Sequence, residues 1–580
     1  MSFNSVTNKD WELKLADKNK ILFLREKFSI SEILSRLLVL RNISIDQIES
    51  FLKPEINIHL IDPNLLLDMN KSVKLIIDDI LNKKITGIFG DYDVDGASAT
   101  AILIKFFNHI NHNSKFYIPD RVNEGYGPSK ITFKKLIDQK VSTIITVDCG
   151  TLSYEAIDFG NLNKVNTIVI DHHQTESKLP KAFGLINPNR VGDKSNLNSL
   201  CATSLVFIFL IALDNKLKKI DWYKDNNILP PNLTNMLDLV ALATICDVVP
   251  LVGINRYFVQ KGLSVIKERK NVGLNAISET CDLKTKTEEY HLGFLYGPRI
   301  NAGGRLGFSS YGAKLLSTND SNEANDLIIK LNKLNEERKK LEDSYLNKIY
   351  KIAEGKKNDS VLVIHDDSFH EGIIGILASR VKDRFNKPTI ILSGIGNTLK
   401  ASARSIYGFD IGLEILNLVE NKIIIKGGGH KMAAGFTIEK KRIDDLKKYL
   451  NEIFFKKMKK KIITDKILID AIISPSALNS NFYEEMNLMK PFGPGNSKPT
   501  FLIESLNVYK STVLNNKHIS SILVSKNKTY INAISFNSYG TLIHDYLMQK
   551  SKKINLVGKL NLNEWKGKKN IQLIIDDIAI

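Results

Sequence analysis

The stretch "IFGDYDVDG" places three carboxylates, Asp91, Asp93 and Asp95, on alternate positions directly after an apolar run. Like charges this close together raise one another's pKa unless a cation lies between them. Hard oxygen ligands suit Mg²⁺ or Mn²⁺ better than a structural zinc ion. The residue types and their spacing therefore indicate a site for divalent cations.

Further acidic and imidazole side chains follow three other apolar segments. Asp148 follows "TIITV", the triplet "DHH" at 171–173 follows "NTIVI", and Asp247 follows "LDLVALATIC". Because ligands of open parallel sheets bind beyond the carboxyl ends of the strands, we expect these side chains to meet at one edge. One aspartate after a strand is usually a cap or a turn former, and Asp171 could mainly hold an imidazole. Four such segments favour a dinuclear site whose ions lie about 3.5–4 Å apart and act on a phosphoryl group.

The elements that position these side chains can be read from the hydrophobic pattern. From residue 85 onward, short strand-like runs alternate with helix-like stretches such as "ATAILIKFFNHI", which predicts a parallel sheet with crossover helices. Between 321 and 352 apolar residues recur at helical spacing without Gly or Pro, which predicts a long helix. A second α/β unit follows, with strands "SVLVIH" and "TIILS". After the basic stretch "FFKKMKKKIITDK", several strand-like segments predict a small β-barrel.

Glycine-rich and basic motifs predict an anion pocket. "GGGH" at 427–430 is interpreted as a turn whose N–H groups can meet phosphate oxygens. Taken alone, it is an ordinary turn. Beside Arg404 in "ASARS" and Arg299 and Arg305 in "PRINAGGR", a phosphate pocket is favoured, because the arginine fork matches phosphate oxygens.

Composition points to a polyanionic partner. Lys and Arg total 81 against 63 for Asp and Glu, a formal charge of +18. A genome rich in lysine codons would give the same balance. The four cysteines form no CxxC pair, so we expect reduced thiols in the cytoplasm and neither a zinc knuckle nor a disulfide framework. No apolar run approaches the roughly 20 residues of a membrane span.

The chain resembles a known family in its ordered motifs. "GDYDVDG", "TVDCGT", "IDHH" and "ATICDVVPL" are similar to the four motifs of the DHH phosphoesterase superfamily. "DRVNEGYG", "YGPRINAGGRLG", "ASARS", "GGGHKMAAGF" and "PFGPGNSKPTF" appear in the order found in the RecJ family of bacterial single-strand-specific exonucleases. The segment "LCATSLVF" departs from that pattern, which has glycines there, and we expect the departure to affect helix packing without touching a metal ligand.

The resemblance implies an α/β fold. A parallel-sheet DHH domain would be joined by a long helix to a smaller α/β DHHA1 domain, with a C-terminal OB-fold β-barrel. The expected boundaries are 1–75 for a helical lead-in, 76–320 for the DHH domain, 321–356 for the connecting helix, 357–456 for the DHHA1 domain and 457–580 for the OB-fold.

The resemblance also implies a ligand set for two Mn²⁺ or Mg²⁺ ions. One ion would be held by Asp93 and Asp148, with Asp91 close by. The other would be held by Asp95, Asp148, His172 and Asp247, so that Asp148 bridges the pair. His173 would face the scissile phosphate. The residues expected to act directly in catalysis are His173, Asp148, Asp93 and Asp95.

Substrate contacts are expected from further motif residues. Tyr126 could stack on a base or pack beneath its loop, and the resemblance favours a grip on the strand. The arginines and "GGGH" would hold the terminal 5′ phosphate. The expected substrate-binding residues are Arg121, Tyr126, Arg299, Asn301, Arg305, Ser402, Arg404, Gly428, Gly429 and His430.

The implied activity is 5′-to-3′ exonuclease hydrolysis of single-stranded DNA to 5′-mononucleotides, in DNA recombination and repair. Expected partners are single-strand-binding protein and a RecQ-type helicase, with no membrane and a monomeric chain. Two alternatives stay open: a DHH phosphodiesterase for short oligoribonucleotides or cyclic dinucleotides, and a non-catalytic single-strand-binding protein. The extra barrel and the charge favour a long polyanion, and the intact acidic motifs count against loss of catalysis.

Overall fold

The computed structural model describes residues 4–54, 62–121, 123–283, 287–458, 466–549, 553–565 and 568–580. The chain forms two compact units, one of Met1–Leu60, Pro250–Gln260 and Ile463–Ile580, the other of Ile61–Val249 and Lys261–Ile462. The four cysteines are free thiols. Within the described ranges, no helix combines the length and the apolar character needed to cross a bilayer.

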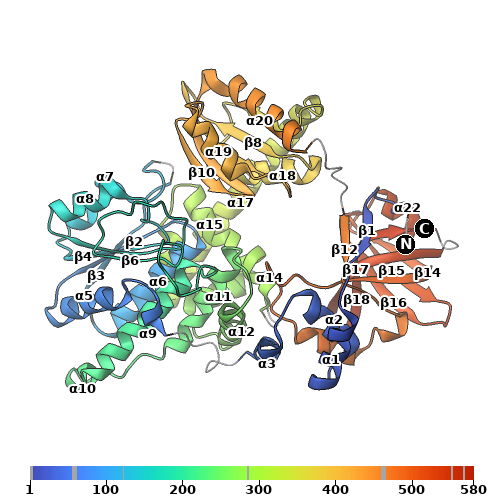
Figure 1. The fold of residues 1–580 in the computed structure, drawn as a ribbon, viewed down its shortest axis with the longest axis horizontal. Coiled ribbons are helices and arrows are strands. Elements are labelled where there is room, and N and C mark those ends of the chain that lie inside the picture. Colours follow the sequence, from blue (N-terminus) through green and yellow to red (C-terminus); the bar gives the residue numbers. More distant parts are fainter. Residues whose placement is uncertain are drawn as a thin grey trace. The chain divides into compact units, whose positions relative to one another are not determined.

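The larger unit begins with a five-stranded parallel sheet in the order β3-β2-β4-β5-β6. Its strands are β2 (Thr86–Gly90), β3 (Ser114–Tyr117), β4 (Thr143–Val147), β5 (Asn166–Ile170) and β6 (Gly184–Ile186). Helices α7 (Lys130–Ile137) and α8 (Tyr154–Leu162) cover one face of the sheet, and α5 (Met69–Leu81), α6 (Val94–His109) and α9 (Ala202–Lys219) cover the other (Figure 1). Strands β2 and β4 are buried along their whole length, as expected of a sheet covered on both faces. The predicted strands at these positions are confirmed.

Helices follow the sheet. They are α10 (Trp222–Asp225), α11 (Leu237–Cys246), α12 (Ile254–Lys267), α13 (Val272–Thr280), α14 (Glu289–His291), the π-helix Leu292–Tyr296, α15 (Gly297–Arg305) and α16 (Tyr311–Ser317). The segment "LDLVALATIC", grouped above with the strands, is the helix α11. It is buried on all sides from Leu237 to Thr244, so its apolar run lacks the periodicity that distinguishes a helix from a strand.

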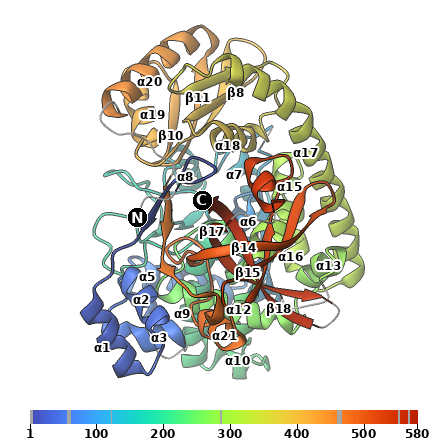
Figure 2. The ribbon, with the colours of Figure 1, turned by 90° about the vertical axis from the view of Figure 1, so that its right-hand side faces the viewer.

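A single long helix, α17 (Ser321–Gly355), connects this part to a smaller α/β domain, as predicted (Figure 2). Leu327, Leu331 and Leu334 are buried along one side of the helix. The smaller domain has a five-stranded sheet in the order β10-β11-β9-β8-β7. Its elements are β7 (Leu362–His365), α18 (Ile374–Phe385), β8 (Thr389–Ser393), β9 (Thr398–Arg404), α19 (Ile411–Glu420), β10 (Lys426–His430), β11 (Ala433–Glu439) and α20 (Ile443–Met458).

The predicted "GGGH" turn is wrong. Gly427, Gly428 and Gly429 lie in β10, which pairs antiparallel with β11 at the edge of the sheet. An added Cβ on Gly429 would lie 2.4 Å from the carbonyl oxygen of Ala433, and one on Gly427 would lie 2.5 Å from Phe436 Cβ. These glycines therefore allow close approach of two strands rather than a tight turn.

The smaller unit contains a closed five-stranded barrel, as predicted. Its strands are β14 (Thr500–Leu514), β15 (His518–Ser525), β16 (Tyr530–Ser535), β17 (Lys553–Trp565) and β18 (Lys568–Ala579), which are labelled in Figure 1. Pairing of β14 with β17 closes the order β14-β15-β16-β18-β17. Helices α21 (Ser480–Asn487) and α22 (Leu542–Leu547) accompany it. The short strand β13 (Ala471–Ile472) pairs with the start of β14.

The N-terminal residues belong to this barrel unit. Strand β1 (Asp10–Leu13) pairs in parallel with β12 (Lys466–Ile469), and helices α1 (Lys18–Phe28), α2 (Glu32–Leu40) and α3 (Ile48–Leu52) follow (Figure 1). Leu34, Leu37 and Leu38 of α2 share a core with barrel residues. The segment 1–75, expected as one helical lead-in, is thus divided between the units, because strand pairing across more than 450 residues leaves no local signal.

Candidate metal centre

The first acidic motif lies at the turn from β2 into α6. Asp91 directly follows β2, and Asp93 caps α6, accepting hydrogen bonds from the N–H groups of Asp95 (2.9 Å) and Gly96 (3.1 Å). Gly96 is required there, because an added Cβ would lie 2.5 Å from the Asp91 carbonyl oxygen. The sheet end and the helix cap together hold the three carboxylates in place.

The second and third motifs follow the neighbouring strands β4 and β5. Asp148 has a φ of +59°, a left-handed backbone conformation that non-glycine residues rarely adopt and that recurs at functional sites. Asp171 Oδ1 lies 2.7 Å from Nδ1 of His173, and Asp171 Oδ2 accepts a hydrogen bond from the Thr151 N–H (3.1 Å). Asp171 therefore holds the imidazole of His173, one of the two roles considered for it.

The fourth motif comes from the C-terminal end of α11, where Asp247 is the capping residue. Its neighbour Val248 also has a left-handed φ, +59°, which is a strained conformation for a β-branched residue. His172 Nε2 lies 3.3 Å from Asp148, 3.6 Å from Asp247 and 3.7 Å from Asp95. The structure thus brings together the side chains that the four motifs predict.

The electrostatics of this cluster favour bound cations. Burial, followed by the charges of neighbouring aspartates, raises the pKa of Asp91, Asp148 and Asp247 well above the ordinary value. Asp91 Oδ1 and Asp247 Oδ2 are buried and accept no hydrogen bond from the described part of the chain. Buried carboxylate oxygens of this kind are the ligands that divalent cations take.

Three overlapping groups of ligand atoms each lie within 4.8 Å of one another. They are Asp91, Asp93 and Asp148; Asp95, His172 and Asp247; and Asp148, His172 and His173. Asp148 belongs to two of them, so its carboxylate lies between the groups. The donor set of carboxylates and imidazole, without a thiolate, fits Mn²⁺ or Mg²⁺.

His173 differs electrostatically from His172. Burial lowers the pKa of His173, but the hydrogen bond and charge of Asp171, with further carboxylates nearby, outweigh this and raise it to about 9. The same partnership holds the pKa of Asp171 below its usual range, although burial acts in the opposite direction. Asp171 therefore favours the protonated form of His173.

Asp95 has a second role that the sequence did not indicate. Its carboxylate accepts hydrogen bonds from the N–H groups of Ala202 (2.7 Å) and Thr203 (2.8 Å), at the start of α9. These residues lie in "LCATSLVF", so the expectation that this segment touches no predicted metal ligand is wrong. A charged carboxylate is favourable at a helix N-terminus, and α9 in turn fixes the position of Asp95.

Aromatic rings line the side of the cluster near Asp91. The ring of Tyr126, 56% exposed, lies edge-on to Tyr92 and to His173, with centroids 6.3 Å apart in each case. Its hydroxyl donates a hydrogen bond to the Asp148 carbonyl oxygen (3.3 Å). The Arg121 guanidinium lies 4.9 Å from the centroid of Tyr92. Tyr126 is thus neither packed away beneath its loop nor remote from the metal ligands.

Two arginines of the predicted anion pocket, Arg305 and Arg404, lie close together, with Arg121 nearby. Burial, with the charges of Arg121, Arg338 and Arg404, lowers the pKa of Arg305 to about 10. Burial and Arg121 lower the pKa of Arg404, whose Nη1 donates to Ser402 Oγ (3.2 Å). Within the described ranges, no carboxylate lies at ion-pair distance from Arg121, Arg305 or Arg404. Three uncompensated cations in one place favour an anionic ligand.

Arg299 does not join this cluster. Its guanidinium donates to Asn332 Oδ1 and to the Leu295 carbonyl oxygen, both at 2.7 Å, which fastens α15 to α17. Asn301 lies half-buried in the same helix. Arg299 therefore has a structural role, because its side chain points from α15 toward α17.

Other residues of this region were missed from the sequence. Gly375 allows close approach of the arginine pocket, since an added Cβ would lie 3.1 Å from Arg404 Nη2 and 3.2 Å from Ser402 Oγ. An added Cβ on Gly372 would lie 2.2 Å from the Arg305 carbonyl oxygen. Both glycines occur in "HEGIIG", and the spacing of the two glycines is the only feature of the sequence that could have identified them. Arg338 of α17 is compensated by Glu342, at 2.6 Å.

The "GGGH" strand lies within electrostatic range of the metal ligands. Burial, together with the charges of His173 and His172, lowers the pKa of His430. Gly428 has open space where a Cβ would stand. β10 is an edge strand, and His430 at its end is exposed within electrostatic range of His172 and His173.

Family models match three parts of the chain. The N-terminal domain of the DHH family matches residues 85–244, the DHHA1 domain matches 358–456, and the RecJ OB domain matches 469–577. These ranges contain the parallel sheet, the smaller α/β domain and the barrel, respectively.

Individual proteins match over most of their length. A single-stranded-DNA-specific exonuclease RecJ from Salmonella typhimurium is 31% identical, covering 85% of this chain and 86% of its own. The crystal structure of RecJ with Mn²⁺ from Thermus thermophilus shares the fold, with a TM-score of 0.81 at 23% identity over 98% of this chain and 79% of that one. A crystal structure of exonuclease RecJ bound to manganese is 28% identical, with a TM-score of 0.57, and covers 69% of this chain and 98% of that one.

Proposed function

This chain belongs to the RecJ family of single-stranded-DNA-specific exonucleases, and we propose that it hydrolyses single-stranded DNA from the 5′ end with two divalent ions. It is a phosphodiester hydrolase that uses Mn²⁺ or Mg²⁺. The observation that carries the proposal is the convergence of buried carboxylates and imidazole from three strand ends and one helix end, with Asp91 Oδ1 and Asp247 Oδ2 accepting no hydrogen bond within the described residues.

The overlapping ligand groups support a division of the residues between two ions. Asp91, Asp93 and Asp148 would hold one ion, and Asp95, His172 and Asp247 would hold the other. Asp148 would also serve the second ion, because its carboxylate lies 3.3 Å from Nε2 of His172. When bound, such ions stabilise charge on phosphoryl oxygens and lower the pKa of a coordinated water. The chain itself orients these ligands through the cap at Asp93 and the N–H groups of α9.

His173 would donate a hydrogen bond to the phosphate under attack. Asp171 keeps the imidazole oriented and protonated, so Nε2 of His173 presents a charged N–H. A positioned donor of this kind stabilises the charge that develops in the transition state. His173 also lies in one ligand group with Asp148 and His172, so the alternative is that His173 binds a metal ion instead of the phosphate.

Polarity would come from the arginine pocket. Arg305, Arg404 and Ser402, with Arg121 beside them, form an uncompensated cationic site suited to a terminal phosphate. The N–H groups of Gly428 and Gly429 and the side chain of His430 would contribute from β10. Arg299 is not part of this proposed pocket, because its guanidinium donates hydrogen bonds to Asn332 of α17 and to the Leu295 carbonyl oxygen.

The barrel and the net charge of +18 support a long polyanionic substrate rather than a short oligoribonucleotide or a cyclic dinucleotide. The intact acidic motifs support catalysis rather than binding alone. Roles in recombination and repair, with single-strand-binding protein and a RecQ-type helicase as partners, rest on the family resemblance.

End-labelled oligonucleotides test the proposal. With Mn²⁺ or Mg²⁺, a strand labelled at the 5′ end should release labelled mononucleotide at once, whereas a strand labelled at the 3′ end should shorten progressively. Duplex and RNA strands should be degraded far more slowly. Release of the 3′ label first would contradict the proposed polarity, and cleavage of short RNA alone would favour the phosphodiesterase alternative.

A further inference from the structure

The main chain of the two histidines in the metal centre is held by side chains at each of its polar groups. Asp171 Oδ1 accepts hydrogen bonds from the N–H groups of His172 (2.8 Å) and His173 (3.2 Å). The His173 carbonyl oxygen accepts a hydrogen bond from Asn187 Nδ2 (2.9 Å), and the His172 carbonyl oxygen accepts one from Asn189 Nδ2. Three side chains thus bond all four main-chain polar groups of the pair.

The two asparagines come from the carboxyl end of β6, which pairs with β5 in the parallel sheet. Asn187 directly follows the strand and is fully buried. Its Oδ1 accepts a hydrogen bond from the Asn189 N–H (2.8 Å), which forms an Asx turn and fixes the second amide relative to the first. Asn187 therefore holds one histidine carbonyl directly and the other through Asn189.

Asn187 also joins the histidines to the loop that carries Asp148. Its Nδ2 donates a second hydrogen bond to Thr151 Oγ1 (3.0 Å), and the Thr151 N–H donates to Asp171 Oδ2 (3.1 Å). Thr151 stands three positions after Asp148 and is buried. One amide thus uses both its N–H groups and its oxygen, and it links the ends of β4, β5 and β6.

We propose that Asn187 is a positioning residue of the metal centre, which fixes the Asp148 carboxylate relative to the imidazoles of His172 and His173. Asp148 lies 3.3 Å from Nε2 of His172, so a small shift of either loop changes this contact. An amide is required, because a carboxylate of the same shape would repel the His173 carbonyl oxygen instead of donating to it. The inference rests on the proposed function and adds to it a residue outside the four acidic motifs.

Hydrogen–deuterium exchange tests the positioning role in the full-length protein without metal. With EDTA present, Asn187→Asp should speed exchange of the amides in peptides covering 148–151 and 171–175 by about tenfold, the effect of one lost net hydrogen bond. Peptides from α20, in the smaller α/β domain, should exchange as in the unaltered protein. This measurement does not depend on activity.

Kinetic and binding measurements separate positioning from folding. Asn187→Asp should lower kcat on single-stranded DNA by about 10²-fold and leave KM within about twofold, because strand contacts persist while the reacting groups shift. Asn189→Ala should weaken Mn²⁺ binding in calorimetry by about tenfold, since it releases the His172 carbonyl, and added Mn²⁺ should restore its turnover. Because Asn189 is only half-buried, this variant tests the inference even where Asn187→Asp fails to fold.

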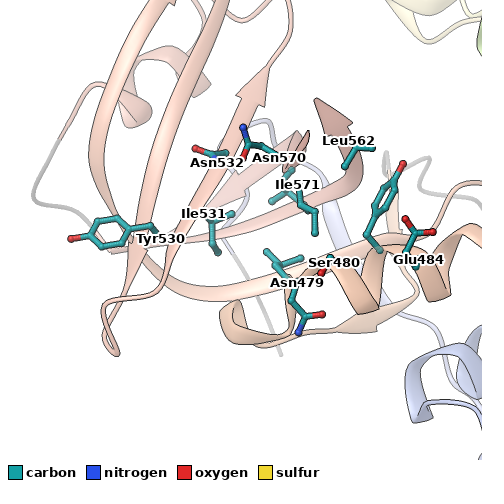
Figure 3. A pocket seen from close by; sticks show the side chains of 12 residues that line it. Asn479, Ser480, Glu484, Tyr530, Ile531, Asn532, Leu562, Asn570 and Ile571 are labelled. Atoms are coloured by element: carbon teal, nitrogen blue, oxygen red, sulfur yellow. The ribbon is translucent and has the colours of Figure 1, made fainter. Parts of the chain in front are cut away.

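Two other asparagines serve as matched controls. Asn161 of α8 donates to the Lys181 carbonyl oxygen (2.9 Å), near the start of β6 and so at the end of the sheet opposite the metal ligands. Asn532 of β16 lines a hollow of about 360 Å³ in the barrel, where Figure 3 shows it. Asn161→Ala and Asn532→Ala should leave kcat and the exchange of 171–175 unchanged.

Unaltered exchange and unaltered kcat in a folded Asn187→Asp chain would overturn the inference, and so would unaltered Mn²⁺ affinity in Asn189→Ala. These results would leave the proposed function intact. Failure of the unaltered protein to degrade single-stranded DNA with either metal would instead overturn the proposed function, while the exchange measurement would still decide the positioning role.

Discussion

Nδ1 of His173 lies 2.7 Å from Oδ1 of Asp171, which follows directly after strand β5. The carboxylate also accepts hydrogen bonds from the N–H groups of His172 (2.8 Å) and Thr151 (3.1 Å). Asp171 is thus fully occupied inside the protein, and its influence on a substrate must pass through the imidazole.

Asp171→Asn should therefore lower kcat by roughly 10²-fold or more while metal binding persists, because the amide removes the charge that keeps His173 protonated. The alkaline limb of the pH profile should move to lower pH, because the hydrogen bond and charge of Asp171 raise the pKa of His173. Pre-steady-state turnover at several pH values measures both effects. An unchanged pH profile, or loss of a bound ion in calorimetry, would assign Asp171 to the metal site instead.

Metal removal should change the pH dependence of stability. The pKa values of Asp91, Asp148 and Asp247 are raised above those of the unfolded chain, so the folded protein without metal binds more protons and loses stability as pH rises. Bound Mn²⁺ favours the ionised carboxylates and removes this loss. The difference in Tm between Mn²⁺ and EDTA should grow from about pH 5 to about pH 8. A constant difference across that range would contradict the cluster's role as ligand.

End recognition can be tested with two arginines of the same chain. Arg404→Ala should penalise strands with a 5′ phosphate by about 1.5–3 kcal/mol in kcat/KM, and strands with a 5′ hydroxyl much less. Arg404→Lys should restore only part, because it lacks the fork. Arg299→Ala is the matched control and should affect both strands equally, since the guanidinium of Arg299 donates hydrogen bonds to Asn332 of α17 and to the Leu295 carbonyl oxygen. An equal loss of kcat/KM on 5′-phosphate and 5′-hydroxyl strands in Arg404→Ala would show that recognition of the 5′ end does not set the polarity.

Deletion of the barrel should affect the N-terminal segment as well. Leu34, Leu37 and Leu38 are fully buried in a core shared with barrel residues. A chain that ends near residue 460 should therefore become sensitive to proteases within residues 4–54. A chain that lacks both the barrel and residues 4–54 should resist digestion better. Limited proteolysis with mass spectrometry compares the two. Protection of residues 4–54 in the first chain would show that they fold without the barrel.

Local signals and non-local contacts explain which features were predictable. The strands that precede Asp91, Asp148 and Asp171 were predicted because apolar runs between helix-like stretches are local patterns. The side chains of Asp247 and His172 also meet, but α11 was not recognised as a helix, because burial on all sides removes its periodicity. The apolar pattern still placed Asp247 at the site, although the segment before it is a helix and not a strand.

Two other errors have a different physical origin, which is contact between segments distant in sequence. The pattern "GGGH" looks the same in a turn and in a strand, and pairing with β11 decides the outcome. Arg299 and Arg305 stand six positions apart in one motif. Arg299 nevertheless donates a hydrogen bond to α17, whereas Arg305 lies near Arg121 and Arg404. Such differences depend on which segment packs against a strand or a helix face, and that segment is distant in the sequence.

The central claim is that Asp148 serves both ions, and its most direct test is the Mn²⁺ stoichiometry of Asp148→Ala measured by calorimetry alongside turnover. The unaltered protein and the control Asp158→Ala, an exposed position in α8, should bind two ions and degrade single-stranded DNA. Asp148→Ala should bind fewer ions and show no cleavage with either Mn²⁺ or Mg²⁺, even at saturating metal. Two bound ions with substantial residual turnover in Asp148→Ala would contradict the account.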